Sequence, residues 1–315
     1  MHSVSPSPAL DSSVDALRID GVSKRFGRVT AVDDLSLRVP RGTIYGFLGQ
    51  NGAGKTTTLR MVMSILYPDA GSIRVLGRPA EAIKDRLGYL PEEKGLYKKM
   101  TAGEILVYFG RLKGLERRVA RRRAAELLER LGLGDWIDQR CETLSKGMGQ
   151  KVQVLATLIH EPELVILDEP FSGLDPVNVD TMREVIRDVA RSGRTVLFST
   201  HIMEQAEKLC DSIAIVHQGR KILDGPLAEV KATAERGILL DYDGALDDAA
   251  PLPGVHRIAD AGKQAEIHLD DGADPQAVLE HLVARGIRIR RFDLREPSLH
   301  EVFVRAVQGG DAADV

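Results

Sequence analysis

The feature that most constrains the fold is a glycine-rich loop between a short apolar segment and a helical one. The loop, Gly49–Thr56, fits the pattern G-x-x-x-x-G-K-[ST]. Residues 42–48 before it have the apolar character of a strand, and residues 57–66 after it have the spacing of a helix. A strand, loop and helix in this order indicate an α/β fold whose ligands bind at the carboxyl ends of the strands.

The same loop has the composition of a phosphate-binding site. Its glycines allow a tight turn, so that successive N–H groups and the positive end of the helix face phosphate oxygens. We expect Lys55 to reach the β- and γ-phosphates of ATP and the Thr56 hydroxyl to bind Mg²⁺. The alternative is a glycine-rich turn that binds nothing, and the combined presence of strand, glycines, lysine and threonine disfavours it. The loop residues predicted to contact ATP are Gly49, Gln50, Asn51, Gly52, Ala53, Gly54, Lys55, Thr56 and Thr57.

A second apolar run, within residues 163–170, ends in the two acids Asp168 and Glu169 and is typical of a buried parallel strand. We expect Asp168 to hold Mg²⁺, as the Walker B acid does in phosphate-loop enzymes. The pleat of a strand turns the next residue the other way, and Glu169 is our candidate for polarising the attacking water. The alternative is that the two acids only cap the turn before Pro170.

A second turn of small residues lies within the run Leu144–Lys151 and precedes a predicted helix over residues 146–159. A serine hydroxyl and backbone N–H groups at a helix N-terminus stabilise anionic oxygen. This turn lies far from the chain's own phosphate loop, so we expect the ATP of a paired subunit to meet it. Ser145 could instead serve only as the N-cap of the helix. The residues predicted to contact that ATP are Ser145, Lys146 and Gly147.

The order of these motifs resembles the ATP-binding subunits of ABC transporters over residues 17–230. The resemblance implies a head-to-tail homodimer, in which each ATP lies between one phosphate loop and the signature turn of the other subunit. It implies that Ser172 and Asp175 communicate between the two sites. His201, which follows an apolar strand over residues 195–200, matches the histidine that contacts the γ-phosphate. A structural role is the alternative for this histidine.

The chain departs from the family pattern in two places. Lys146 and Met148 replace the usual glycine and glutamine of the signature, and the nearest glutamine is Gln150. Glu92 stands where the family has a glutamine. A carboxylate can still bind Mg²⁺, and it adds negative charge near the triphosphate. The alternative for Glu92 is an exposed loop acid.

The adenine ring of ATP needs a flat partner. Phe26 lies where the family places an aromatic residue that stacks on adenine. A core or surface aromatic residue is the competing interpretation, and Tyr45 is a weaker candidate for the same role.

Composition narrows the classes of function. A chain of 315 residues with a net charge of −3 does not suit a general nucleic-acid binder, and Cys141 and Cys210 suit neither a disulfide framework nor a zinc site. No apolar run approaches the ~18 residues of a membrane span. We expect residues 1–16 to be a disordered leader. A membrane permease would therefore be a separate polypeptide, with this chain on the cytoplasmic face of the membrane.

The predicted ATPase domain spans residues 17–230 and combines the α/β core with an antiparallel β subdomain and a helical subdomain over about 101–160. The antiparallel strands are predicted over residues 17–20, 35–39 and 72–76. The basic run at 117–123 is interpreted as a solvated helix face and not as a nucleic-acid or headgroup site.

A small α+β domain is predicted over residues 237–307, followed by a tail over 308–315, and we assign the domain to dimer contact or regulation. Its C-terminal segment, residues 296–304, resembles the closing helix of drug- and sodium-exporter ATPases. Its predicted strands cover residues 238–242, 264–269 and 287–292, and its predicted helices cover 275–285 and 298–307.

We therefore expect the ATP-hydrolysing subunit of an exporter for sodium or drugs, with ATP and Mg²⁺ as cofactors. The alternative is a soluble ABC ATPase that switches a ribosome- or DNA-linked complex. A single phosphate loop and the lack of sustained heptads favour transport. A monomeric kinase or GTPase would leave the signature turn unexplained.

Overall fold

A computed structural model describes residues 15–93, 95–233, 236–244, 246, 251–270 and 272–311. Residues 1–14 of the expected leader therefore lie outside the described residues. Residues 312–315 of the expected tail lie outside them as well. The chain divides into two compact units, 1–224 and 225–315, and each is described by itself. Among the residues that the structure describes, every helix is too short or too polar to span a lipid bilayer.

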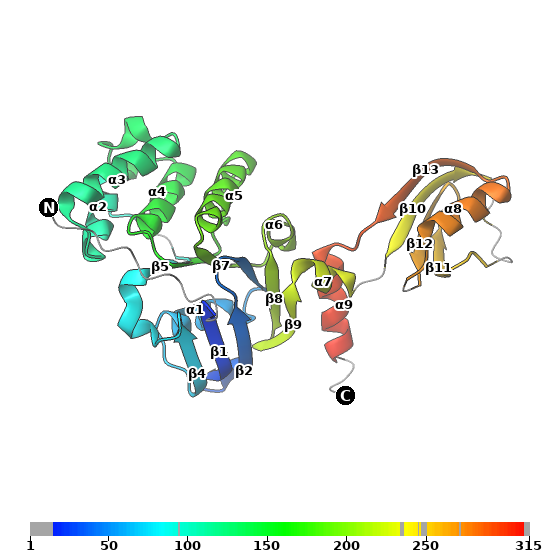
Figure 1. Ribbon diagram of the computed structural model, residues 1–315, viewed down its shortest axis with the longest axis horizontal. Coiled ribbons are helices and arrows are strands. Elements are labelled where there is room, and N and C mark those ends of the chain that lie inside the picture. The colour runs from blue at the N-terminus through cyan, green and yellow to red at the C-terminus, as the bar shows by residue number, and fades with distance from the viewer. Residues whose placement is uncertain are drawn as a thin grey trace. The chain divides into compact units, whose positions relative to one another are not determined.

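The first unit is built on a six-stranded sheet with the order β5-β6-β7-β3-β8-β9 (Figure 1). The first five strands in that order run parallel to one another. Strands β3, β6 and β7 are buried along their whole length, as expected for parallel strands covered on both faces. The strands are β5 (Leu87–Leu90), β6 (Leu164–Asp168), β7 (Thr195–Thr200), β3 (Ile44–Leu48), β8 (Ser212–His217) and β9 (Arg220–Pro226).

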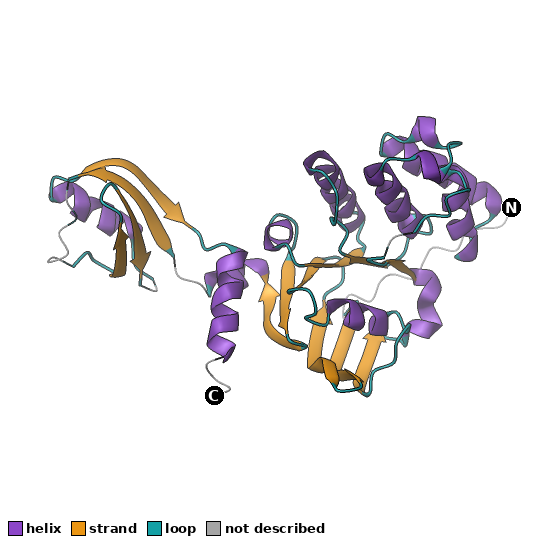
Figure 2. Cartoon of the chain, turned by 180° about the vertical axis from the view of Figure 1, so that it is seen from behind, coloured by secondary structure: helices purple, strands orange, loops and turns teal. Residues whose placement is uncertain are grey.

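A three-stranded antiparallel sheet, β2-β1-β4, accompanies the larger one. Its strands are β1 (Leu17–Phe26), β2 (Val29–Val39) and β4 (Ala70–Val75), and they extend beyond the predicted ranges. Helix α1 (Lys55–Val62) lies between the two sheets (Figure 2). The predicted limits of this helix, 57–66, were wrong, because the helix starts directly after Gly54 and Ser64 has a left-handed backbone with φ +52°.

The helical subdomain contains α2 (Ala102–Leu112), α3 (Arg117–Arg130) and α4 (Lys146–Leu158), which group beyond β5 in Figure 1. Thr101 and Glu104 form a capping box at the start of α2. The buried faces of the three helices share one core. Most arginines of the basic run are exposed, as the predicted solvated face requires. The remaining helical elements of this unit are the 3₁₀ turns 80–86, 134–136 and 141–143, α5 (Pro176–Arg191) and α6 (Met203–Glu207).

The second unit contains a four-stranded antiparallel sheet with the order β11-β12-β10-β13. Strand β11 was not predicted, because most of its residues are exposed and show no apolar alternation. One apolar core joins the sheet to α8. The elements are α7 (Leu227–Ala232), β10 (Gly237–Asp243), β11 (Val255–Asp260), β12 (Gln264–Leu269), α8 (Pro275–Ala284), β13 (Arg288–Arg295) and α9 (Leu299–Asp311).

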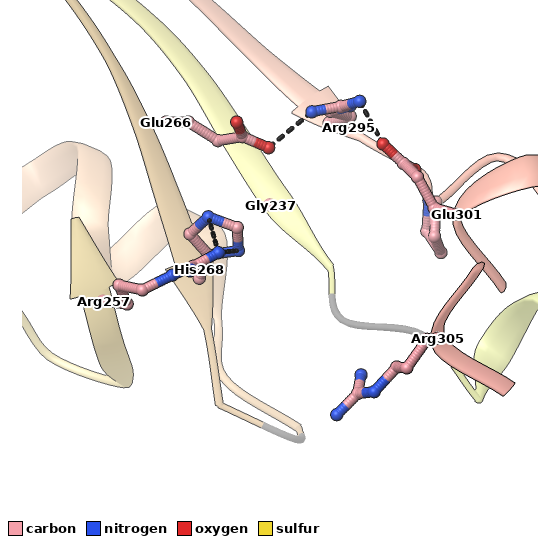
Figure 3. Close-up of a pocket in the computed structure, with 8 residues that line it drawn as sticks. Gly237, Arg257, Glu266, His268, Arg295, Glu301 and Arg305 are labelled. Atoms are coloured by element: carbon pink, nitrogen blue, oxygen red, sulfur yellow. Dashed lines mark hydrogen bonds and ion pairs between the residues drawn. The ribbon is translucent and has the colours of Figure 1, made fainter. Parts of the chain in front are cut away.

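A polar pocket of about 470 Å³ lies within the second unit (Figure 3). Arg295, at the end of β13, bonds both Glu266 of β12 and Glu301 of α9. On another wall, Arg257 Nη2 lies 2.8 Å from His268 Nε2. The double contact of Arg295 fixes the first turn of α9 to the edge of the sheet.

Candidate active site

The phosphate loop connects β3 to α1 at the carboxyl end of the sheet. Gly54 has a left-handed backbone with φ +99°, and a Cβ there would lie 2.3 Å from Ala31 O. A Cβ on Gly49 would lie 2.3 Å from Val216 O. No side chain caps the start of α1, so its first N–H groups remain available to an anion. The glycines are therefore required by the shape of the loop.

Lys55 lies at the centre of the site and is buried. Its Nζ donates to Gly49 O at 2.7 Å and to Gln50 O at 3.1 Å, and lies 3.7 Å from Glu169 Oε1. Burial lowers the pKa of Lys55, whereas the nearby carboxylates of Glu169 and Asp168 act in the opposite direction. The lysine is therefore held between the loop and the two acids.

Asp168 ends β6 and is fully buried. The hydroxyl of Ser199, on β7, donates to Asp168 Oδ1 and accepts from the backbone N–H of Glu169 at 3.0 Å. Within the part of the chain that the structure describes, Asp168 Oδ2 is buried and has no hydrogen-bond partner. Burial raises the pKa of Asp168, and the hydroxyls of Ser199 and Thr56 oppose that rise. The sequence analysis missed Ser199, although a hydroxyl just before His201 in an apolar strand was a signal.

The pleat of the strand was predicted to orient Glu169, but in the structure the conformation of its own backbone orients it. It lies beyond the end of β6 and has a left-handed backbone with φ +49°. Its Oε1 lies 2.9 Å from His201 Nδ1, and its side chain is almost fully buried. The structure therefore brings together Lys55 at the start of α1, Glu169 just after β6 and His201 just after β7.

Two oxygen-bearing side chains, those of Thr56 and Glu92, lie close to each other near the buried Asp168 carboxylate. Thr56 Oγ1 lies 3.3 Å from Glu92 Oε2, and the Thr56 hydroxyl also acts on the Asp168 carboxylate. Mg²⁺ prefers oxygen ligands in proteins. The unpartnered Oδ2 of Asp168 and this set of oxygens fit a magnesium ion.

The signature turn, Ser145–Gly149, begins α4. Ser145 caps this helix, because its hydroxyl oxygen accepts from Met148 N at 3.3 Å, and its own hydrogen is still able to donate. Gln150 does not face a nucleotide: it is buried and donates to Pro170 O. Asp175 caps α5 by accepting from Asn178 N at 3.0 Å, and Ser172 is exposed two residues after Pro170.

The two adenine candidates differ sharply in exposure. Phe26 ends β1 with 47% of its surface exposed, and Lys24 Nζ lies 5.7 Å from its ring centre. Tyr45 is buried in β3, and its hydroxyl donates to Asp224. Burial and the Asp224 carboxylate raise the pKa of Tyr45. The suggestion that Tyr45 stacks on adenine was wrong, because its ring is buried and has no exposed face on which adenine could stack.

A phosphate loop on a parallel sheet, with an acid pair and a histidine at neighbouring strand ends, defines an ATPase of the ABC type. The family model of ABC transporters matches residues 32–172. The model of the C-terminal domain of DrrA1-3-like ATP-binding proteins matches residues 225–307. The chain belongs to the family of ABC transporter ATP-binding proteins.

Individual relatives support this assignment over most of the chain. An ABC transporter ATP-binding protein of Bacillus subtilis, YhaQ, is 41% identical over 293 residues, which cover 92% of this chain and 98% of the relative. The daunorubicin/doxorubicin resistance ATP-binding protein DrrA of Streptomyces peucetius is 34% identical over 95% of this chain and 94% of its own. A solved ATP-binding subunit of an ABC transporter superposes with a TM-score of 0.64 at 32% identity, over 69% of this chain and 92% of its own.

The chain is thus an ATPase that binds ATP and powers transport. Proteins of this family work with separate transmembrane permease subunits. The α/β core with antiparallel and helical subdomains, and the additional C-terminal α+β unit, agree with the predicted fold class.

Proposed function

We propose that this chain hydrolyses Mg·ATP as a homodimer and drives the export of a small organic molecule through a separate permease at the inner face of the membrane. The observation that carries the proposal is the cluster of Lys55, at the start of α1, with Asp168, Glu169 and His201, at the carboxyl ends of the neighbouring strands β6 and β7. Each of these groups has a defined task in phosphoryl transfer to water.

The buried Glu169 carboxylate accepts a proton from the attacking water. His201, 2.9 Å away, orients this carboxylate and the water and donates to the γ-phosphate. Lys55 balances the negative charge that the γ-phosphate carries in the transition state. Its buried ammonium acts strongly because little water screens it.

Magnesium would be held by the Thr56 hydroxyl and by the carboxylates of Asp168 and Glu92. Bound there, the ion would neutralise charge on the β- and γ-phosphate oxygens. Ser199 supports this site, because it bonds one oxygen of Asp168, while the other has no hydrogen-bond partner among the described residues.

The second half of each site would come from a second copy of the chain. Ser145, Lys146 and Gly147 lie at the start of α4, and the hydrogen bond made by Ser145 is to its own helix. The turn therefore offers a hydroxyl and helix N–H groups to an outside anion. We assign Ser172 and Asp175 to communication between the paired sites and Phe26 to adenine stacking.

Export of an organic compound is supported by the relatives that match both units of the chain. The DrrA protein named above is called a daunorubicin/doxorubicin resistance protein, and the linearmycin resistance protein LnrL of Bacillus subtilis is 31% identical over 91% of this chain. Sodium is the second candidate substrate class, because residues 296–304 resemble the closing helix of drug- and sodium-exporter ATPases. The ABC transporter ATP-binding protein NatA of Bacillus subtilis is 46% identical over 68% of this chain.

We place the permease contact beside Glu92. A pocket of about 290 Å³ there includes Pro91, Leu96 and Phe109 among its lining residues. Nearby, the rings of Tyr97 and Tyr108 meet edge to face at 5.7 Å, and both residues are exposed. Exposed aromatic residues beside a pocket suit a helix of another protein.

The test of the proposed function is a substitution of the base. Glu169→Gln should bind ATP normally while the rate of hydrolysis falls by ~10² or more. The variant should also accumulate an ATP-bound dimer, which light scattering detects. Glu93→Gln is the control, because it neutralises an exposed acid by the same substitution. This variant should hydrolyse ATP like the unmodified chain. Undiminished hydrolysis by Glu169→Gln would remove this residue from its role.

A further inference from the structure

Two glycines, one at the start of α4 and one in the turn before α5, each lie beneath a longer side chain from the other segment. Gly147 is in the signature turn, and a Cβ there would lie 2.5 Å from Asn178 Nδ2 on α5. Gly173 is in the D-loop, defined here as residues 172–175, and a Cβ there would lie 2.2 Å from Lys146 Nζ. The signature turn and the D-loop are thus interlocked at two points, with one long side chain contributed from each side.

Asn178 is held in place by the residue that caps α5. Its Nδ2 donates to Asp175 Oδ2 at 2.6 Å, and its backbone N donates to Asp175 Oδ1 at 3.0 Å. One carboxylate oxygen therefore holds the side-chain amide against Gly147, and the other holds the backbone of the same residue. A third contact joins the same segments, because Gln150 of α4 donates to Pro170 O, next to Glu169.

We propose that Lys146 and Asn178 are positioning residues that lock the signature turn to the D-loop of the same chain. This accounts for the lysine where the family usually has glycine, because only a long stem reaches across Gly173. The lock joins two parts of one chain that act at different ATP sites. The segment after Glu169 belongs to the site of the chain's own phosphate loop, and the signature turn belongs to the site of the partner subunit. That consequence rests on the proposed function, whereas the lock itself does not.

The contact between Asn178 and Gly147 is tested by thermal unfolding of the full chain without nucleotide. Alanine is a better helix former than glycine, so Gly147→Ala should raise the unfolding midpoint unless Asn178 obstructs the new methyl group. We expect Gly147→Ala to lower the midpoint in the unmodified chain and to raise it in the Asn178→Ala background. Gly149→Ala is the matched control on the same helix, because its Cβ would meet only Leu96 Cδ1, at 3.5 Å. It should raise the midpoint in both backgrounds.

Each outcome is decisive for the contact. The lock is supported if Gly147→Ala lowers the unfolding midpoint of the unmodified chain but raises that of the Asn178→Ala variant, while Gly149→Ala raises both. An identical effect of Gly147→Ala in the two backgrounds overturns it. Because no ATP is present, failure here leaves the assignment of Glu169 untouched. Conversely, a failure of the Glu169 test would leave these unfolding midpoints valid.

The lysine is tested through amide exchange of residues 171–175, again without nucleotide. Lys146→Ala should accelerate exchange roughly threefold or more, as expected when one close side-chain contact is lost. Lys151→Ala removes the same charge from the same helix and should have no effect. Equal exchange in the two variants would show that Lys146 does not restrain the D-loop.

Discussion

Ser199→Ala should destabilise the ATPase unit far more than the loss of one hydroxyl usually does. The Ser199 side chain is fully buried and makes two hydrogen bonds, one to the Asp168 carboxylate and one from the Glu169 N–H. Alanine leaves both of these buried groups without that partner.

A hydrogen bond to a charged group contributes about 1.5–3 kcal/mol, and an unsatisfied buried amide costs about 1–3 kcal/mol. Relaxation recovers part of this, so we expect a loss of about 2–4 kcal/mol in the free energy of unfolding. That is a large part of the 5–15 kcal/mol typical of a folded domain, at roughly 0.1 kcal/mol per residue.

The loss should depend on pH. Burial raises the pKa of Asp168 in the folded protein, and the Ser199 hydroxyl opposes that rise, so the variant has a still higher folded-state pKa. The stability that Ser199 contributes is therefore present where Asp168 is ionised. The part that comes from the bond to the Asp168 carboxylate is lost as the pH falls through the folded-state pKa of Asp168, whereas the part that comes from the Glu169 N–H remains.

The assay is urea unfolding without Mg²⁺ or nucleotide, at neutral and at mildly acidic pH. Ser192→Ala is the control, because its hydroxyl donates to the neutral carbonyl of Val189 at 2.6 Å. It should cost about 0.5–1.5 kcal/mol at both pH values. A Ser199→Ala loss no larger than that of the control, or one that does not change with pH, would refute the account given for Asp168.

Three further predictions concern the nucleotide. Glu92→Gln removes one negative charge and should tighten ATP binding by about 1 kcal/mol at limiting Mg²⁺, and identical Mg²⁺ titrations of the two proteins would make Glu92 a solvated loop acid. Ser145→Arg and Lys55→Ala should each abolish hydrolysis, and mixing them should restore at most one competent site per heterodimer; full activity of Ser145→Arg as a monomer would contradict the composite site. Phe26→Ala should raise the KM for ATP by about fivefold with kcat unchanged, from the ~1 kcal/mol of a stacked aromatic pair, and Phe26→Trp should restore it; an unchanged KM in the alanine variant would leave Phe26 a surface residue.

Much of the site was predictable because its motifs are local. The phosphate loop, Asp168 and His201 each occupy the end of an apolar run, and parallel strands deliver such ends to one edge of the sheet. The partner contacts were not predictable in this way. Ser199 is separated from Asp168 by 31 residues along the chain, and periodicity does not show which neighbouring strand a side chain will meet.

The errors have physical causes as well. Tyr45 belongs to a strand covered on both faces, and an aromatic residue there has the same sequence signature as one at an open edge. Glu169 follows the last residue of β6, where a left-handed backbone replaces the pleat. Strand β11 pairs with β12, and its Val255 and Ile258 pack against the core. These two residues are three apart and not two, because the register shifts between Val255 and Arg257, so the strand showed no alternating apolar pattern.

Helix α4 is anchored to the sheet near both of its ends, so its length fixes the position of the signature turn relative to the strand ends. Near its start, Gln150 bonds the carbonyl just beyond the end of β6. Near its end, the Thr157 carbonyl lies so close to Gly88 on β5 that a Cβ there would approach it to 2.8 Å. Each added or removed turn would shift the signature turn by about 5.4 Å relative to the strand ends. In the proposed dimer, the length of this helix would therefore set how far the signature turn reaches toward the nucleotide of the partner subunit. Point substitutions would change the strength of that contact, whereas only insertions or deletions would change the distance.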